Sequence, residues 1–333
     1  MKKIKRFGSI FSLFILFSCQ NKQEKNTISH KKEDTEDDSK STTNFSYNLK
    51  NPTHSWVLPS DLVEVSGNAW IDKDHLLFIE DLKPNLYYVK FDLKNATLEK
   101  TVPFIETDKE KVDIEDVTIV DNVVYALWSH GVLFKITDWQ NNPQIEKIKT
   151  GLSKDNNTEG LCFDPVTRQL LIACKDSSGT GEDSAKAVYS FNMESMKLNE
   201  TPFMVIHPKD FIALTGSSLS FNPSAIAVHP VTHDIYVLTT RDNKGMAIFT
   251  HDGILKSYQP IEKELMEQPE GICFNPKGKL IISSEGKKGD PGNLFEFDPG
   301  NENGVRGLSN KQEKNKEKEK ESEFGLKLHK MKY

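Results

Sequence analysis

One nine-residue stretch occurs twice in this chain with little change. NTEGLCFDP at residues 157–165 returns as QPEGICFNP at residues 268–276. Three weaker copies share the same pattern, so that the five openings are EVSGNAW (64–70), DIEDVTI (113–119), NTEGLCF (157–163), NPSAIAV (222–228) and QPEGICF (268–274). Each has a small or acidic anchor residue before an apolar run, and these anchors are Ser66, Glu115, Glu159, Ser224 and Glu270. An internal repeat constrains the fold more than any other feature of a sequence.

The repeating unit is a set of short strands. After each anchor come an apolar strand, a polar turn, a second apolar strand with a polar end, a third strand and a looser fourth. The anchors are 49, 44, 65 and 46 residues apart, and units of about 45 residues with four strands predict the blades of a β-propeller. The longer third spacing predicts an insertion at 177–186 or 203–220. Residues 257–268 are expected to form a short helical segment of a turn or two.

The number of anchors predicts an all-β, five-bladed propeller over residues 45–299. The fifth unit lacks one strand, and HSWVLP (54–59) precedes the first anchor without belonging to any unit. We expect this segment to pair beside the last strand and close the ring, which removes an exposed sheet edge. The alternative is a six-bladed propeller, with residues 45–60 and the insertion supplying another blade.

The two ends of the chain differ from the repeat. Residues 1–18 carry a basic start and a short apolar run, and residues 16–19, LFSC, resemble a bacterial lipoprotein box. We therefore expect cleavage before Cys19, lipidation of its thiol and attachment to a membrane of the cell envelope through its acyl chains. An ordinary secretory signal is the alternative. Residues 19–44 are expected to be a disordered tether, and residues 300–333 a charged, disordered tail.

The overall charge bears on possible partners. The 333 residues carry a formal net charge of −6, which argues against non-specific nucleic-acid binding because that requires a basic face. Besides Cys19 the chain has Cys162, Cys174 and Cys273, an odd number for an exported protein. Small core residues are the favoured role for these thiols, with a disulfide as the alternative.

Polar residues recur where a propeller places its central channel. Two residues before the anchors stand Glu64, Asp113, Asn157, Asn222 and Gln268, and residues i and i+2 of a strand share one face. Converging carboxylates repel one another by about 1–4 kcal/mol per close pair. Protonation, a basic neighbour or a cation relieves this repulsion.

These oxygens predict a calcium site at Glu115, Glu159 and Glu270, because calcium accepts six to eight oxygen ligands with loose geometry. The other polar residues of the rim would support it. The structural alternative is that each glutamate caps backbone amides and joins neighbouring blades. His229 and His233, in HPVTH, are interpreted as surface-turn residues rather than metal ligands.

The order and spacing of these segments resemble the SdiA-regulated domain family of bacterial exported and membrane-attached proteins. The likeness covers about residues 50–299. It implies a five-bladed propeller distantly related to NHL-repeat propellers and a calcium site, but no established activity. Two departures are EDVTI, where the family has Glu-Gly, and NPSAI, which lacks a glycine after Ser224.

Two functions of different classes follow from the sequence. The first is a membrane-anchored lipoprotein that binds calcium and presents its loops to an unknown small ligand or protein. The second is a metal-dependent hydrolase of lactones or phosphoesters with the cation in the channel. Charged and polar groups at the ends of second strands would serve that chemistry or form solvated loops: Lys175, Asp176, Arg241, Asp242, Ser284 and Glu285.

Overall fold

The computed structural model describes residues 45–105 and 112–301, which belong to the compact unit Thr43–Tyr333. The predicted signal peptide, Cys19, the tether up to residue 44 and the tail from residue 302 lie outside the described residues. Among those described, no helix has the length and apolar character needed to cross a membrane.

Five antiparallel sheets form the blades of the described chain. Blade 1 contains β3 (Val65–Trp70), β4 (His75–Glu80), β5 (Asn85–Phe91) and β6 (Ala96–Pro103). Blade 2 contains β7 (Ile114–Val120), β8 (Val123–Trp128), β9 (Val132–Thr137) and β10 (Gln144–Lys149). Blade 3 contains β11 (Thr158–Asp164), β12 (Gln169–Cys174), β13 (Lys186–Asn192), β14 (Lys197–Leu198) and β15 (Met204–Ile206). Blade 4 contains β16 (Pro223–Val228), β17 (Ile235–Thr239), β18 (Gly245–Phe249) and β19 (Leu255–Pro260). Blade 5 contains β20 (Gln268–Phe274), β21 (Leu280–Glu285), β22 (Asn293–Phe297) and β2 (His54–Val57).

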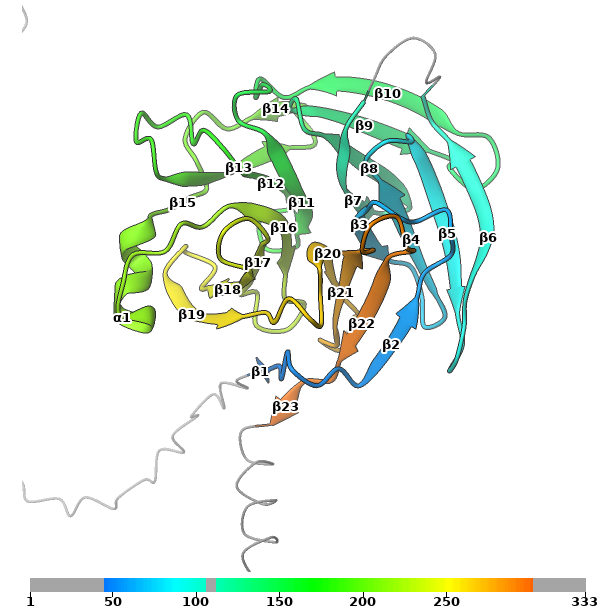
Figure 1. Ribbon diagram of the computed structural model, residues 1–333. Helices are drawn as coiled ribbons and strands as arrows, with labels where there is room; N and C mark the ends of the chain where they lie inside the picture. The colour runs from blue at the N-terminus through cyan, green and yellow to red at the C-terminus, as the bar shows by residue number, and fades with distance from the viewer. Residues whose placement is uncertain (1–44, 106–111, 302–333) are drawn as a thin grey trace, which may run out of the picture. The chain divides into compact units, whose positions relative to one another are not determined.

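The first strands of the blades form a closed inner ring. Contacts run from β3 to β7, then to β11, β16 and β20, and back to β3. Figure 1 shows these strands around a common centre, with the later strands of each blade farther out. The structure is therefore the five-bladed propeller that the repeat predicts, and the six-bladed alternative is wrong.

The ring closes through the N-terminal segment, as the sequence predicts. Strand β2 pairs antiparallel with β22, so that Trp56 lies opposite Leu294. Strand β1 (Phe45–Ser46) pairs with β23 (Gly300–Asn301), which places the first two residues of the predicted tail in a short strand. Tyr47, just after β1, is buried, and its hydroxyl contacts the backbone of Gly278.

Apolar side chains fill the gap between each pair of neighbouring blades. The inner strands are buried along most of their length because both faces of every sheet meet another blade. Five large apolar clusters of the described residues result, one for each gap, and a small sixth one contains Cys174, Ala187 and Tyr189. Cys162 and Cys174 are buried free thiols, and Cys273 is a partly buried one.

Three local features differ from the predictions or refine them. The insertion in blade 3 includes both predicted segments: the loop before β13, and a stretch with β15, the 3-10 helix η1 (Pro208–Phe211) and α1 (Ile212–Thr215). The predicted helix at 257–268 is wrong, since β19 and a turn occupy this region. His229 is in a turn but is fully buried rather than exposed, and burial lowers its pKa to about 4.

Candidate functional site

The five anchor residues share one backbone feature. In every blade, the pairing of the first and second strands shifts by one residue at a β-bulge. The residues skipped by this shift are Ser66, Glu115, Glu159, Ser224 and Glu270. A bulge turns its extra side chain away from the regular alternation of the strand. The repeat therefore sets five bulge residues at equivalent positions, near the start of the inner strands, and we call this end of the ring the anchor mouth.

The two serine anchors join neighbouring blades. The Ser66 hydroxyl donates to the backbone oxygen of Ile114 at 2.8 Å, and that of Ser224 donates to the oxygen of Pro269 at 3.0 Å. Each acceptor directly precedes the anchor of the next blade. Both serines are buried, so each hydroxyl links its blade to the next one in the ring.

The three glutamate anchors come together from blades 2, 3 and 5. Glu159 and Glu270 are only 5% and 8% exposed, and Glu115 is half-buried. Burial raises the pKa of Glu115 well above its usual value, and the neighbouring carboxylates of Glu159 and Asp113 raise it further. Burial also raises the pKa of Glu270 to about 8, with Glu159 and Glu285 adding to the effect. These carboxyls therefore form one cluster with raised pKa values, and they ionise less readily than free glutamates do.

Lys175 supplies the positive charge of this cluster. It follows β12, and its Nζ lies 2.9 Å from Glu159 Oε2. The other oxygen of Glu159 accepts from Asn157 Nδ2 at 2.8 Å. Burial acts to lower the pKa of Lys175, but the carboxylates of Glu159, Glu270 and Glu115 outweigh it and raise the pKa. Lys175 is therefore a protonated counter-ion inside the anchor mouth.

A second group of carboxyls lies at the blade 1 and blade 5 side of the mouth. Burial is the main cause that raises the pKa of Asp81 to about 7, and repulsion from the carboxylates of Glu64, Glu80 and Glu285 adds to it. The pKa of Glu285 also rises to about 7, mainly through burial. Asp81 Oδ1 is buried without a hydrogen-bond partner among the described residues. Part of this group is therefore protonated at neutral pH.

The described residues do not form a metal centre in this arrangement. No group of three or more His, Cys, Asp or Glu side chains within residues 45–105 and 112–301 is placed to hold a metal ion. Both carboxylate oxygens of Glu159 are already paired, one with Lys175 and the other with Asn157. A basic neighbour and raised carboxyl pKa values, two of the three means of relief expected from the sequence, are both found at the mouth, and calcium binding stays a prediction.

The remaining predicted rim residues are spread around the mouth. Asp113 accepts from the Ser129 hydroxyl at 2.9 Å, and the exposed Gln268 donates to Glu285. The buried Asn222 lies 3.4 Å from Asp242 Oδ2. Among the strand-end residues, Ser284 is buried and accepts from the Gln268 amide, while Arg241 pairs with Asp176 at 3.1 Å across blades 3 and 4.

Asp116 is an important residue that the sequence reasoning missed. It is 1% exposed, and its two oxygens accept from the amides of Val117 and Leu161, both at 2.7 Å. Burial raises its pKa well above the usual value. The repeat itself marks Asp116 as unusual, because the residue after the anchor is glycine or alanine in the four other units. Asp81 was missed too, although it follows the polar end of a second strand.

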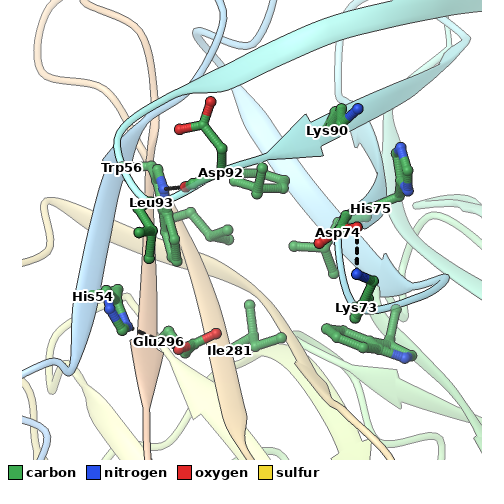
Figure 2. A pocket seen from close by; sticks show the side chains of 14 residues that line it. His54, Trp56, Lys73, Asp74, His75, Lys90, Asp92, Leu93, Ile281 and Glu296 are labelled. Atoms are coloured by element: carbon green, nitrogen blue, oxygen red, sulfur yellow. Dashed lines mark hydrogen bonds and ion pairs between the residues drawn. The ribbon is translucent and has the colours of Figure 1, made fainter.

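Two hollows lie away from the anchor mouth. One, of about 340 Å³, is at the other end of the inner strands and is lined in part by Trp70, Phe163 and Phe274. The other, of about 410 Å³, lies between blades 5 and 1 and is shown in Figure 2. The second hollow contains none of the predicted site residues.

Comparison with known proteins supports the fold alone. No protein-family model matches the chain, and no match was found among curated proteins. Among solved structures, glutaminyl cyclase from Myxococcus xanthus superposes with a TM-score of 0.53 at 12% identity, over 75% of this chain and 95% of that one. The PQQ-bound aldose sugar dehydrogenase from Streptomyces coelicolor gives a TM-score of 0.48 at 13% identity, over 78% and 99% of the two chains. A gluconolactonase from Xanthomonas campestris gives 0.45 at 12% identity, over 73% and 78%.

Proposed function

We propose that this chain is a cell-envelope lipoprotein whose propeller is a binding module, with the anchor mouth as the binding site for a cationic group. One observation carries the proposal: Glu115, Glu159 and Glu270, which are far apart in sequence, gather around the single ammonium of Lys175. A site built this way is complementary to positive charge. The resemblance to the SdiA-regulated domain family, and the calcium site that it implies, agree with this proposal.

The electrostatics of the mouth explain how a second positive charge would be accepted. Lys175 faces the glutamate anchors, whereas Asp81 and Glu285 have pKa values of about 7 and are partly protonated at neutral pH. A bound cation stabilises the ionised form of a nearby carboxyl. Binding therefore releases protons and strengthens as the pH rises through 7. Calcium is the inorganic candidate because it prefers carboxylate and carbonyl oxygens.

Calorimetry and thermal unfolding test this proposal. With calcium, the melting temperature should rise relative to chelator, and titrations in buffers of different ionisation enthalpy should reveal proton release. The double variant Asp81→Asn/Glu285→Gln should release fewer protons, whereas Glu194→Gln, in an exposed turn of blade 3, should release as many as the unaltered protein. The proposal fails for calcium if neither the melting temperature nor the heat of titration changes.

A hydrolase is the second candidate, and one specific observation favours it. Glu270 has a pKa of about 8, so it carries a proton at neutral pH, whereas burial raises the pKa of Glu159 and the ammonium of Lys175, 2.9 Å away, opposes that rise. A protonated carboxyl beside one that a cation helps to ionise is an arrangement that acid–base catalysis uses. A screen of lactones and phosphoesters, with and without chelator, tests this candidate. Turnover that Glu270→Gln abolishes would support it, and no turnover of any substrate would count against it.

Membrane attachment rests on residues 16–19, LFSC, outside the described residues. Expression of the full chain and of Cys19→Ser in a bacterial host, followed by detergent phase partition and mass spectrometry, tests the anchor. The unaltered chain should enter the detergent phase and carry diacylglycerol on Cys19, and the variant should remain in the aqueous phase. A soluble, unmodified mature chain would contradict the prediction.

A further inference from the structure

The hollow between blades 5 and 1, which we call the seam pocket, lies where the N-terminal strand closes the ring. Its walls come from β2, β21 and β22 of blade 5 and from β4, β5 and adjoining turns of blade 1 (Figure 2). Its volume of about 410 Å³ falls within the range of about 300–1,000 Å³ found for small-molecule sites. The seam pocket is therefore large enough for a ring-shaped ligand.

Three aromatic side chains contribute to the apolar part of the seam pocket, beside four aliphatic ones. Trp56 and Trp70 both line it, together with Phe91, whose ring meets that of Trp56 edge-on at 5.4 Å between centroids. Trp56 is fixed across the seam because its Nε1–H donates to the backbone oxygen of Asp92 at 2.8 Å. At the rim, Leu93 is 85% exposed, a large apolar side chain left open to solvent. Flat aromatic surfaces of this kind suit a ligand with an apolar face.

The polar groups of the seam pocket include three acid–base pairs. Lys73 Nζ lies 3.3 Å from Asp74 Oδ2, and His54 Nδ1 lies 3.1 Å from Glu296 Oε1 (Figure 2). Lys90, also in the lining, pairs with Glu99 at 3.9 Å. An ionic ligand would meet both signs at once and would compete with these pairs. A hydroxyl group both donates and accepts, so it can bind beside either partner without adding charge.

We propose that the seam pocket binds a neutral saccharide. The C–H face of a sugar ring would pack on the aromatic lining, and its hydroxyls would bond to Lys73, Asp74, His54 and Glu296 at the rim. This combination of an aromatic surface and paired donors and acceptors is what a neutral, polyhydroxylated ring requires. The proposal is independent of the cation proposed for the anchor mouth, because the two sites share no residue.

The four tryptophans of the chain provide a test with an internal control. Titration of the 15N-labelled protein with glucose, N-acetylglucosamine and cellobiose should shift the indole N–H signals of Trp56 and Trp70. The signals of Trp128 and Trp139, which belong to the core between blades 1 and 2, should stay in place. Shifts of all four signals, or of none at millimolar sugar, would overturn the proposal.

Variants separate a specific pocket from general surface binding. Phe91→Ala should weaken saccharide binding by about tenfold, the effect of losing roughly 1.4 kcal/mol of aromatic contact. Asp74→Asn replaces one of two acceptor oxygens at the rim by a donor, leaves the core unchanged and should weaken binding as well. Leu82→Ala, at an exposed apolar residue outside the lining, should bind sugar normally. Binding of a fatty acid or an anionic dye in place of every sugar would show that the ligand class is wrong.

Discussion

Lys175 decides the chemistry of the anchor mouth at the scale of single residues. The glutamate anchors alone would be a set of buried, mutually repelling carboxyls, and the pKa values of Glu115 and Glu270 rise for that reason. The ammonium of Lys175 turns part of this repulsion into a paired charge at Glu159. The negative charge at Glu159 is therefore compensated only while the side chain of Lys175 stays beside it.

Replacement of Lys175 by methionine should destabilise the protein in a pH-dependent way. Loss of one partner of a buried ion pair costs about 3–5 kcal/mol, and this cost should be larger at pH 8, because Glu159 is ionised in the unfolded chain there while burial opposes its ionisation in the fold. At pH 5 it should shrink, because a protonated carboxyl needs no counter-ion. Urea unfolding at both pH values measures the difference, with the exposed Lys197→Met as the control.

The same variant tests the cation proposal directly. If the anchor mouth binds cations, calcium or a small alkylammonium ion should raise the melting temperature of Lys175→Met more than that of the unaltered protein. Equal shifts in the two proteins would show that the added cation acts elsewhere. No rescue by either ion would leave Lys175 as a purely structural counter-ion.

Replacement of Glu270 by glutamine should remove a pH-dependent loss of stability. The pKa of Glu270 is raised from 4.5 to about 8 in the fold, so the folded state holds its proton longer than the unfolded chain does. Its contribution to stability is present below pH 4.5 and is lost as the pH rises toward 8. At pH 9, Glu270→Gln should be more stable than the unaltered protein by about 1–3 kcal/mol. Parallel pH profiles for the two proteins would contradict this assignment.

The position of the anchors was predictable, but their surroundings were not. The repeat alone indicates that Glu115, Glu159 and Glu270 come from equivalent places, and a ring brings such places together. The side chain of Lys175 belongs to no repeated position with a common chemistry, since the equivalent ends of second strands differ. Whether it turns into the mouth or into solvent depends on rotamers and burial, which a sequence pattern does not contain.

At the scale of strands, the bulges and the serine anchors hold neighbouring blades in register. Ser66→Ala should leave the backbone oxygen of Ile114 without its 2.8 Å hydrogen bond, and Ser224→Ala should do the same for Pro269. Each loss should cost about 1–2 kcal/mol of unfolding free energy. The two sites lie in different blade interfaces, so the double variant should show nearly the sum.

A matched control keeps this prediction specific. Ser195→Ala, in an exposed turn of blade 3, should change the free energy of unfolding by less than about 0.5 kcal/mol. Unchanged stability of Ser66→Ala and Ser224→Ala would mean that the hydroxyls make no net contribution. The bulges themselves could not be predicted, because the inner strands are buried on both faces and their apolar runs do not alternate, so the apolar pattern does not specify the pairing register.

At the scale of the whole molecule, closure of the ring was predictable from the number of strands in each repeat unit. Blade 5 lacks a strand, and residues 54–59 form an apolar stretch without a unit; only the pairing of β2 with β22 satisfies both facts.

The predicted helix at 257–268 was wrong because strand pairing decides the structure of this segment. The ladder with β18 extends β19 to Pro260, and this tertiary pairing overrides the local preference of the sequence.

Removal of the closing strand should therefore weaken every blade, although it deletes only the edge of one. A chain of residues 60–301 loses the buried Leu58 and the cross-seam bond of Trp56, and it exposes the edge of β22. A chain of residues 45–301 keeps them and should melt like the full chain, in one transition. The shorter chain should melt at a lower temperature, and a peptide of residues 45–60 should restore part of the loss. Because each blade buries its faces only against its neighbours, an opened ring that remained equally stable would show that the blades fold independently.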